Sequence, residues 1–178
     1  KGVIERFSQI NPKILFISDR YYYNGIEINL LERLPEILKK IKSIKHVVVI
    51  NYPGKNYLRI KNTKNNKILK WSKILDIKSS VIKFKKFDFD QDLVILYSSG
   101  TTGKPKCICH RAGGVLLQHL KEHVLHCDIR PMDNIFYFTT CGWMMWNWLV
   151  SALATKASIL LFDGSPFVPN EKNLFKIA

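Results

Sequence analysis

The chain has 178 residues, of which 47% are apolar and 24% charged, so it is long enough to bury a core and is not a disordered segment. Its formal charge is +14, but the lysines are scattered without an arginine-rich stripe, which excludes a typical nucleic-acid-binding surface. No signal-peptide pattern and no apolar run of membrane-spanning length occur, so we expect a cytosolic protein without a membrane span.

The first part of the chain carries strand and hairpin patterns. Ile14–Ile17 predicts a short strand, because it is an apolar run that follows a breaker. In Tyr21–Ile28, the Asn24-Gly25 pair with alternating side chains on either side predicts a tight hairpin. The tyrosines of this hairpin are interpreted as packing residues and not as a stacking platform.

A helix and a second strand are predicted next. Apolar residues recur at helical spacing between Leu30 and Ile44, and Pro35 should either kink this helix or begin its main part. His46–Ile50 reads as a buried strand. A strand, helix and strand in this order predict a parallel pair with a right-handed crossover, and therefore an α/β fold.

The stretch that follows is less regular. Residues 51–66 are rich in Asn, Lys and Gly and predict an exposed connecting loop. Trp71–Leu75 fits a short helix, and Val81–Phe89 fits either a strand or an extended connector. The acidic residues Asp88, Asp90 and Asp92 lack the glycine and glutamate of a calcium-binding loop.

The most informative stretch is Leu93–Lys106. A run of five apolar residues is followed by small hydroxylated residues, two glycines and two lysines, which predicts a buried strand that ends in a phosphate-binding loop. Gly100 and Gly103 permit positive φ angles, so backbone N–H groups can converge on an anion. Hydroxyl groups and the charges of Lys104 and Lys106 add further donors.

This loop differs from a Walker A loop. That pattern requires a glycine five residues before the Gly-Lys pair and a Ser or Thr after it, whereas this chain has Ser98 and Pro105 there. Cys107–His110 also looks like a strand, so the loop is expected to join two strands instead of beginning a helix.

Gly113-Gly114 opens the next predicted helix. Its expected apolar face carries Val115, Leu116, Leu120 and Val124, and its opposite face carries Gln118, Lys121 and Glu122. His119, His123 and His126 are spaced by four and three residues and could in principle bind a metal, but a structural cluster is favoured. The four cysteines, at positions 107, 109, 127 and 141, are expected to be reduced and half-buried.

Two further strands are predicted, at Ile135–Thr140 and Ser158–Phe162, with Cys141–Trp143 as a turn between them. In open α/β sheets, ligands collect at the carboxyl ends of strands, so we expect Gly142–Met145 to lie near the phosphate loop. Periodicity alone does not decide whether these Trp and Met side chains form core or pocket.

The residues Tyr97–Lys106 resemble the ATP-phosphate loop of the adenylate-forming, AMP-binding acyl-CoA synthetases. Further stretches are similar to the same family and extend the resemblance through nearly the whole chain: His110, Ala112–Gly114, Leu117–His123, Gly142–Trp148 and Asp163–Pro166. Many relatives have a glycine where this chain has Cys107. The resemblance assigns no metal to the histidines.

The resemblance implies the large N-terminal domain of such an enzyme and a ligase that joins acetoacetate to coenzyme A through an acyl-adenylate, with ATP and Mg²⁺, in ketone-body and lipid metabolism. It implies that the phosphates contact Ser98, Ser99, Gly100, Thr101, Thr102, Gly103, Lys104 and Lys106. Thr101 and Lys106 are the implied catalytic residues. Gly142, Trp143, Met144 and Met145 are the implied acyl pocket, in which the two methionines would shape a small cavity for a short acid.

The resemblance also implies that the chain is an internal fragment, 1–178, of a longer AMP-binding domain. Residues 1–90 would form its first βα portion and connector, and residues 91–178 its phosphate-loop and acyl-pocket portion. The contacts to adenine, the acidic residue associated with magnesium and the C-terminal lysine would lie outside it, and the fragment alone is expected to be inactive. Alternatives are an acetyl- or propionyl-CoA synthetase and a non-catalytic nucleotide-binding segment. The oligomeric state is left open.

Overall fold

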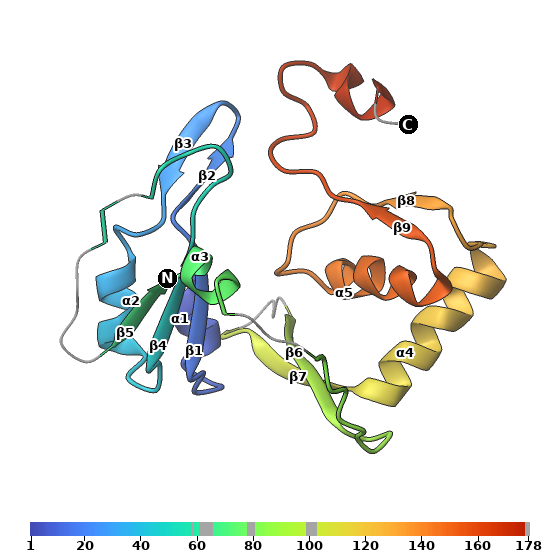
Figure 1. The fold of residues 1–178 in the computed structure, drawn as a ribbon, viewed down its shortest axis with the longest axis horizontal. Helices are drawn as coiled ribbons and strands as arrows, with labels where there is room; N and C mark the ends of the chain where they lie inside the picture. The colour runs from blue at the N-terminus through green and yellow to red at the C-terminus, as the bar shows by residue number, and fades with distance from the viewer. Residues whose placement is uncertain (58, 61–65, 78–80, 99–102, 177–178) are drawn as a thin grey trace. The chain divides into compact units, whose positions relative to one another are not determined.

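A computed structural model describes the chain apart from residues 58, 61–65, 78–80, 99–102 and 177–178. The chain divides into two compact units, one formed by residues 1–83 with 164–178 and the other by residues 84–163. Figure 1 shows the elements of both units in chain order. Helices and strands alternate, so the predicted α/β class is confirmed. The division between residues 90 and 91 that the sequence suggested stays a prediction.

The first unit contains a three-stranded parallel sheet in the order β1-β4-β5. Its strands are β1 (Ile14–Ser18), β4 (His46–Ile50) and β5 (Lys67–Lys70). The predicted parallel pairing of β1 with β4 is confirmed, with Ile14 opposite His46. The sequence did not predict β5, because only two apolar residues lie between its terminal lysines and its identity as a strand comes from its pairing with β4.

Helix α2 (Leu34–Lys40) supplies much of the apolar core of this unit. It is shorter than the predicted helix, and Pro35 lies in its first turn, where a missing N–H costs nothing, so the proline begins the helix and does not kink it. Leu34, Ile37 and Leu38 pack with Val47 and Val49 of β4. Two short helices also lie in this unit: α1 (Gly2–Phe7) and α3 (Trp71–Leu75), the second of which was predicted.

A two-stranded hairpin of β2 (Arg20–Tyr23) and β3 (Ile26–Asn29) follows β1. Asn24 and Gly25 have φ angles of 51° and 77°, the left-handed values that this tight turn requires, so the predicted hairpin is confirmed. Most side chains are strained at such angles, but glycine adopts them freely and asparagine tolerates them.

A buried ion pair connects this hairpin to the segment after β4. Asp19 is fully buried, and its carboxylate accepts hydrogen bonds from the Arg20 guanidinium (3.2 Å) and from the backbone N–H of Tyr52 (2.9 Å). Arg20 also donates to the carbonyl oxygen of Asn56 at 2.7 Å. The segment predicted to be a loop is therefore fixed at two of its described residues by buried charges.

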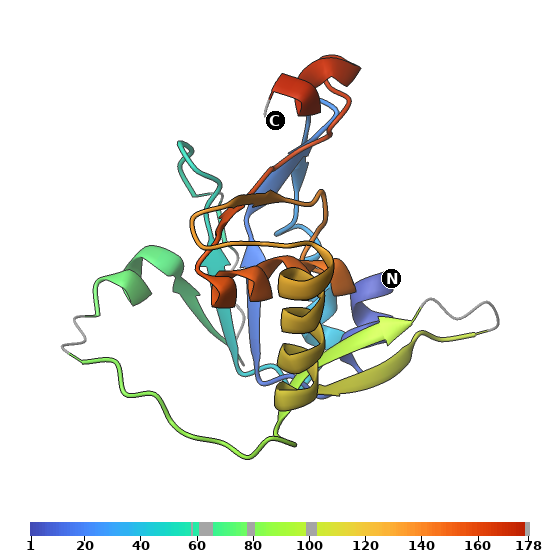
Figure 2. The same cartoon turned by 90° about the vertical axis from the view of Figure 1, so that its right-hand side faces the viewer.

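The second unit begins with an antiparallel ribbon of β6 (Asp92–Ser98) and β7 (Lys106–Arg111). Strand β7 leads directly into α4 (Ala112–Leu120), which continues as the π-helical segment η1 (Lys121–His126), so that the two form one rod (Figure 2).

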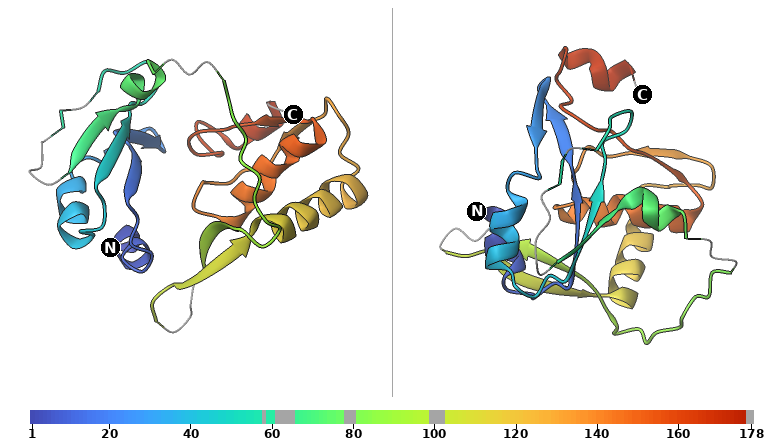
Figure 3. Two further views of the ribbon diagram at one scale, coloured as in Figure 1. Left: turned by 60° about the horizontal axis from the view of Figure 1, so that its bottom comes forward. Right: turned by 60° about the vertical axis from the view of Figure 1, so that its left-hand side comes forward.

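Helix α5 (Met144–Ser151) packs against α4 and is extended by the 3₁₀ turn η2 (Ala152–Thr155) (Figure 3). Strands β8 (Asn134–Phe136) and β9 (Ser158–Leu160) form a parallel pair in the same unit. The 3₁₀ helix η3 (Glu171–Lys176), near the end of the chain, belongs to the first unit.

Several details of the second unit differ from the predictions. Strand β6 is not buried, because it pairs only with β7 in the described residues and leaves Leu93 58% exposed. Strands β8 and β9 are shorter than predicted, since each offers the other only three residues to pair with. Residues 81–88 form no helix or strand, so the connector alternative holds for this stretch. All four cysteines are free, as predicted, but exposed instead of half-buried.

Within the described part of the chain, no helix combines the length and the apolarity needed to cross a bilayer.

Candidate functional site

The predicted phosphate loop joins β6 to β7. Ser98 and Lys106 are the last paired residues of this ribbon, so the predicted phosphate loop lies between two strands, as expected. Gly103 has a φ angle of 129°, as predicted for a glycine that shapes this loop. Lys104 and Lys106 are exposed. Ser99, Gly100, Thr101 and Thr102 lie outside the described residues.

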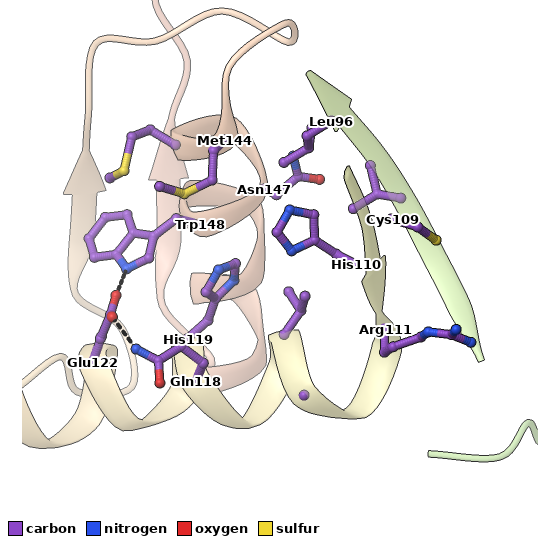
Figure 4. A pocket seen from close by; sticks show the side chains of 14 residues that line it. Leu96, Cys109, His110, Arg111, Gln118, His119, Glu122, Met144, Asn147 and Trp148 are labelled. Atoms are coloured by element: carbon purple, nitrogen blue, oxygen red, sulfur yellow. Dashed lines mark hydrogen bonds between the residues drawn. The ribbon is translucent and has the colours of Figure 1, made fainter. Parts of the chain in front are cut away.

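A pocket of about 520 Å³ lies between this ribbon and the two packed helices of the second unit (Figure 4). It is lined by residues of β6 and β7, of α4 and η1, and of α5: Val94, Leu96, Cys109, His110, Arg111, Gly114, Val115, Gln118, His119, Glu122, Met144, Met145, Asn147 and Trp148.

Strand register decides which ribbon side chains face this pocket. Val94 lies opposite His110, and Leu96 is two residues from Val94, so these three side chains share one face of the ribbon. Figure 4 shows the Cys109 and Arg111 side chains pointing away from the pocket. Arg111 instead forms an exposed ion pair with Asp92 at 2.7 Å.

A carboxylate network closes one end of the pocket. The Glu122 carboxylate accepts hydrogen bonds from the side-chain amide of Gln118 (2.6 Å) and from the indole N–H of Trp148 (2.8 Å), drawn as dashed lines in Figure 4. The hydrogen bond from Gln118 lowers the pKa of the Glu122 carboxyl below its usual value, so this group is ionised at neutral pH. The network ties α5 to η1 and fixes the Trp148 ring.

A second polar network lies between α4, η1 and α5. The Ser151 hydroxyl donates to the carbonyl oxygen of Trp148 (2.7 Å) and lies 2.9 Å from Nδ1 of His119 and 3.0 Å from Nε2 of His123. Because its hydrogen goes to Trp148, the Ser151 oxygen accepts from both imidazoles. Burial lowers the pKa of His119 and of His123, so both rings are neutral at pH 7. The two histidines therefore hold the helices together as neutral hydrogen-bond donors.

These contacts correct the predicted orientation of the helix. The expected apolar residues Leu116 and Val124 are 45% and 41% exposed, whereas His119 and His123 are buried. The reason is that α5 presents the Ser151 hydroxyl and the Trp148 carbonyl on this side, and these bond to one ring nitrogen of each histidine. His126 is exposed and does not join the other two histidines. Among the described residues, no three His, Cys, Asp or Glu side chains come together to hold a metal ion.

The four residues predicted to form the acyl pocket are divided between two cavities. Met144 and Met145 line the pocket of about 520 Å³. Trp143 and Met145 line a smaller cavity of about 210 Å³ with Tyr137, Phe138, Thr139 and Thr140. Gly142 lines neither of these two cavities.

Sequence reasoning missed several residues of the larger pocket. His110 was noted in a predicted strand and in the family resemblance, Gln118 and Glu122 as an outer helix face, and Asn147 and Trp148 only within a motif. The spacing of Gln118 and Glu122, four residues apart on a helix, was a usable signal for a hydrogen-bonded pair. No comparable local signal pointed to Asn147, because its neighbours along the chain are apolar.

Comparisons with known proteins cover nearly the whole chain. A family model described as "AMP-binding enzyme" matches residues 3–177. The acetoacetyl-CoA synthetase of Gallus gallus is 46% identical over 179 residues, which cover 99% of this chain and 27% of that protein. The acetoacetyl-coenzyme A synthetase of Rhizobium meliloti is 43% identical over 178 residues, with 100% and 27% covered.

A solved structure of an acetoacetyl-CoA synthetase is also similar to this chain. The acetoacetyl-CoA synthetase from Streptomyces lividans is similar with a TM-score of 0.88 and 37% sequence identity, over 99% of this chain and 26% of that chain. This chain thus spans about a quarter of the length of the proteins that it matches.

Proposed function

Because this chain belongs to the AMP-binding enzyme family, we propose that the protein that carries it ligates acetoacetate to coenzyme A through an acyl-adenylate. The observation that carries the proposal is the similarity to acetoacetyl-CoA synthetases over 99% of this chain. The chain itself would contribute the phosphate loop and part of the acyl pocket.

The reaction would proceed in two steps. A carboxylate oxygen of acetoacetate attacks the α-phosphorus of ATP, and the bond between this phosphorus and the bridging oxygen breaks, so that pyrophosphate leaves. The sulfur of coenzyme A then attacks the acyl carbon. The bond between this carbon and the oxygen that it shares with the phosphate breaks, so that AMP leaves with this oxygen. Negative charge builds up on the leaving group in the first step, and fixed donors stabilise it most effectively.

The loop between β6 and β7 would supply these donors. Backbone N–H groups and hydroxyls of Ser98, Ser99, Gly100, Thr101, Thr102 and Gly103 would contact the β- and γ-phosphates. Lys104 and Lys106 would add charge, and Thr101 and Lys106 would contribute most to catalysis. The positive φ of Gly103 and the exposure of both lysines support this role.

The acid would occupy the pocket of about 520 Å³. This pocket is bordered by Leu96, two residues before the end of β6, so an acid inside it could present its carboxylate toward the loop. Met144 and Met145 would limit the length of the acid, because their flexible side chains fill space that a longer chain would need. A short acid is therefore favoured.

ATP and coenzyme A would act as substrates, and Mg²⁺ is expected to accompany the triphosphate. The described residues bring no set of three metal-binding side chains together, so they do not form a protein cage for this ion. Magnesium commonly binds nucleotide phosphates with one or two carboxylates and several waters.

The test is pyrophosphate exchange into ATP by the full-length protein, with acetoacetate, acetate or propionate as the acid. Exchange that depends on acetoacetate and exceeds that with the other two acids is the expected result. A preference for acetate or propionate would replace the proposed substrate, and an absence of exchange with every acid would favour a non-catalytic nucleotide-binding protein.

A further inference from the structure

Two polar side chains in the pocket have no hydrogen-bond partner among the residues that the structure describes. In the part of the chain that the structure describes, the Asn147 amide and the His110 imidazole line the pocket and make no hydrogen bond. The neighbouring polar groups differ, because Gln118, Glu122 and Trp148 bond to one another and His119 bonds to Ser151. Asn147 and His110 therefore differ from these neighbours in having both their donors and their acceptors available to a ligand.

These two side chains come from opposite walls of the pocket. His110 belongs to β7 and lies on the same face of the ribbon as Val94, whereas Asn147 belongs to α5. Figure 4 shows both side chains pointing into the pocket between Leu96 and His119. Both are partly buried, so a ligand that covered them without offering an acceptor would leave amide or imidazole donors unpaired.

The charge of Glu122 favours one orientation of a carboxylate ligand in the pocket. Glu122 is ionised and lies at the end of the pocket opposite Leu96 (Figure 4). A carboxylate ligand is repelled by this end, so it enters with its uncharged end first and keeps its carboxylate on the side of Leu96 and the loop. The middle of the acyl chain then lies beside Asn147 and His110.

We propose that Asn147 and His110 donate hydrogen bonds to an oxo group on the acyl chain and so select a 3-oxo acid over an alkanoic acid of equal length. This inference rests on the proposed function and deepens it. Asn147 offers its amide N–H and His110 its ring N–H, and the 3-oxo oxygen of acetoacetate is an acceptor for either donor. A site that hydrogen-bonds a substrate group rejects the analogue that lacks it far more strongly than an apolar pocket does.

The test compares acetoacetate with butyrate, which has the same number of carbons and a methylene in place of the oxo group. Pyrophosphate exchange gives kcat/KM for each acid in the full-length protein and in its Asn147→Leu and His110→Phe variants. Asn134→Leu is the matched control, because Asn134 is exposed and lies outside the pocket.

In Asn147→Leu, the ratio of kcat/KM for acetoacetate to that for butyrate is expected to fall at least ~30-fold, the scale of losing one hydrogen bond to a covered acceptor. Butyrate activity should be kept or raised, which shows that the variant folds. His110→Phe should lower the ratio in the same direction, and Asn134→Leu should leave it unchanged.

Three results would overturn the inference. If the wild type prefers acetoacetate and both variants keep that preference, the oxo group is recognised elsewhere and only this inference fails. If both acids lose activity equally in each variant, the side chains support the pocket without reading the oxo group. If the wild type exchanges with no acid, or prefers acetate, the proposed function fails and this inference fails with it.

Discussion

Replacing Gly113 with alanine is expected to destabilise α4, although alanine is the better helix former. A Cβ atom on Gly113 would lie 2.2 Å from Cδ2 of Phe89 and 2.4 Å from Cε2 and Cγ of the same ring. Ordinary carbon contacts are about 3.5–4.0 Å long, so the ring has to move by more than 1 Å. The backbone of Phe89 is not free to follow, because its carbonyl accepts a hydrogen bond from the Gly113 N–H at 2.9 Å.

Forcing extra atoms into such a contact costs about 1–3 kcal/mol, and the change from glycine to alanine within a helix returns about 0.5–1 kcal/mol. The net loss is therefore about 0–2.5 kcal/mol, and about 1 kcal/mol for the middle of the two ranges. Gly114 provides the matched control, because it is the next residue of the same helix and a Cβ there has no heavy atom within 4 Å. Gly114→Ala should stabilise α4 by about 0.5–1 kcal/mol.

Hydrogen exchange of the α4 amides, followed by mass spectrometry, measures the free energy of opening this helix. Gly113→Ala should lower that free energy and Gly114→Ala should raise it. In a Phe89→Ala background the clash is gone, and Gly113→Ala should then become stabilising. If Gly113→Ala and Gly114→Ala have the same sign in the wild-type background, the close contact with Phe89 does not constrain the helix and the reasoning is refuted.

Three further predictions concern pH, catalysis and the buried ion pair. Because burial holds the pKa values of His119 and His123 below the ordinary 6.5, their contribution to stability is complete above pH 6.5 and is lost as the pH falls toward their pKa values in the folded state. The urea midpoint should therefore fall between pH 7.5 and pH 5. This fall should be less steep in His123→Leu and as steep as in the wild type in His126→Leu. Thr101→Ala combined with Lys106→Ala should slow adenylation at least ~100-fold in pyrophosphate exchange, and a rate as fast as that of the exposed control Lys121→Ala would contradict the role of the loop. Asp19→Ala removes the carboxylate that accepts hydrogen bonds from Arg20 and from the Tyr52 N–H, so it should lower the urea midpoint of the unit that contains β1 and β4. Asp76→Ala, at an exposed ion pair, should have little effect on this midpoint. Equal shifts of the midpoint in the two variants would show that the buried pair contributes nothing.

The sequence predicted those parts of the fold that local patterns control. The apolar runs at β1 and β4 place alternate residues on the two faces of a sheet, and the Asn24-Gly25 pair admits the positive φ angles of a tight turn. The strands around the phosphate loop were also found, because a change from apolar to small polar residues marks the end of a strand. These features depend on residues that are close in sequence.

The buried face of α4 was not predictable in this way. Periodicity assigns apolar residues to the core, but His119 and His123 are buried because Ser151, 32 and 28 residues away in the chain, accepts their hydrogen bonds. The exposure of Leu116 and Val124 follows from the same packing. Whether a polar side chain lies inside thus depends on partners that only the folded chain brings together.

The free polar groups of the pocket also depend on contacts between residues that are distant in the sequence. Met144 and Met145 were identified by resemblance, whereas the availability of Asn147 and His110 depends on which neighbouring groups already bond to one another. The amino-acid sequence alone does not show which side chains bond to one another in the folded protein. The sequence could therefore name two residues that line this pocket, Met144 and Met145, but it could not show which side chains of the pocket lack hydrogen bonds.

The junction between β7 and α4 has no spare residue, since Arg111 ends the strand and Ala112 begins the helix. Inserting or deleting a single residue there would rotate the helix by about 100° relative to the strand, because an α-helix has 3.6 residues per turn. Such a rotation would carry His119 and His123 away from Ser151. We therefore expect differences in length between this chain and its relatives to occur in the connecting segments and to spare this junction.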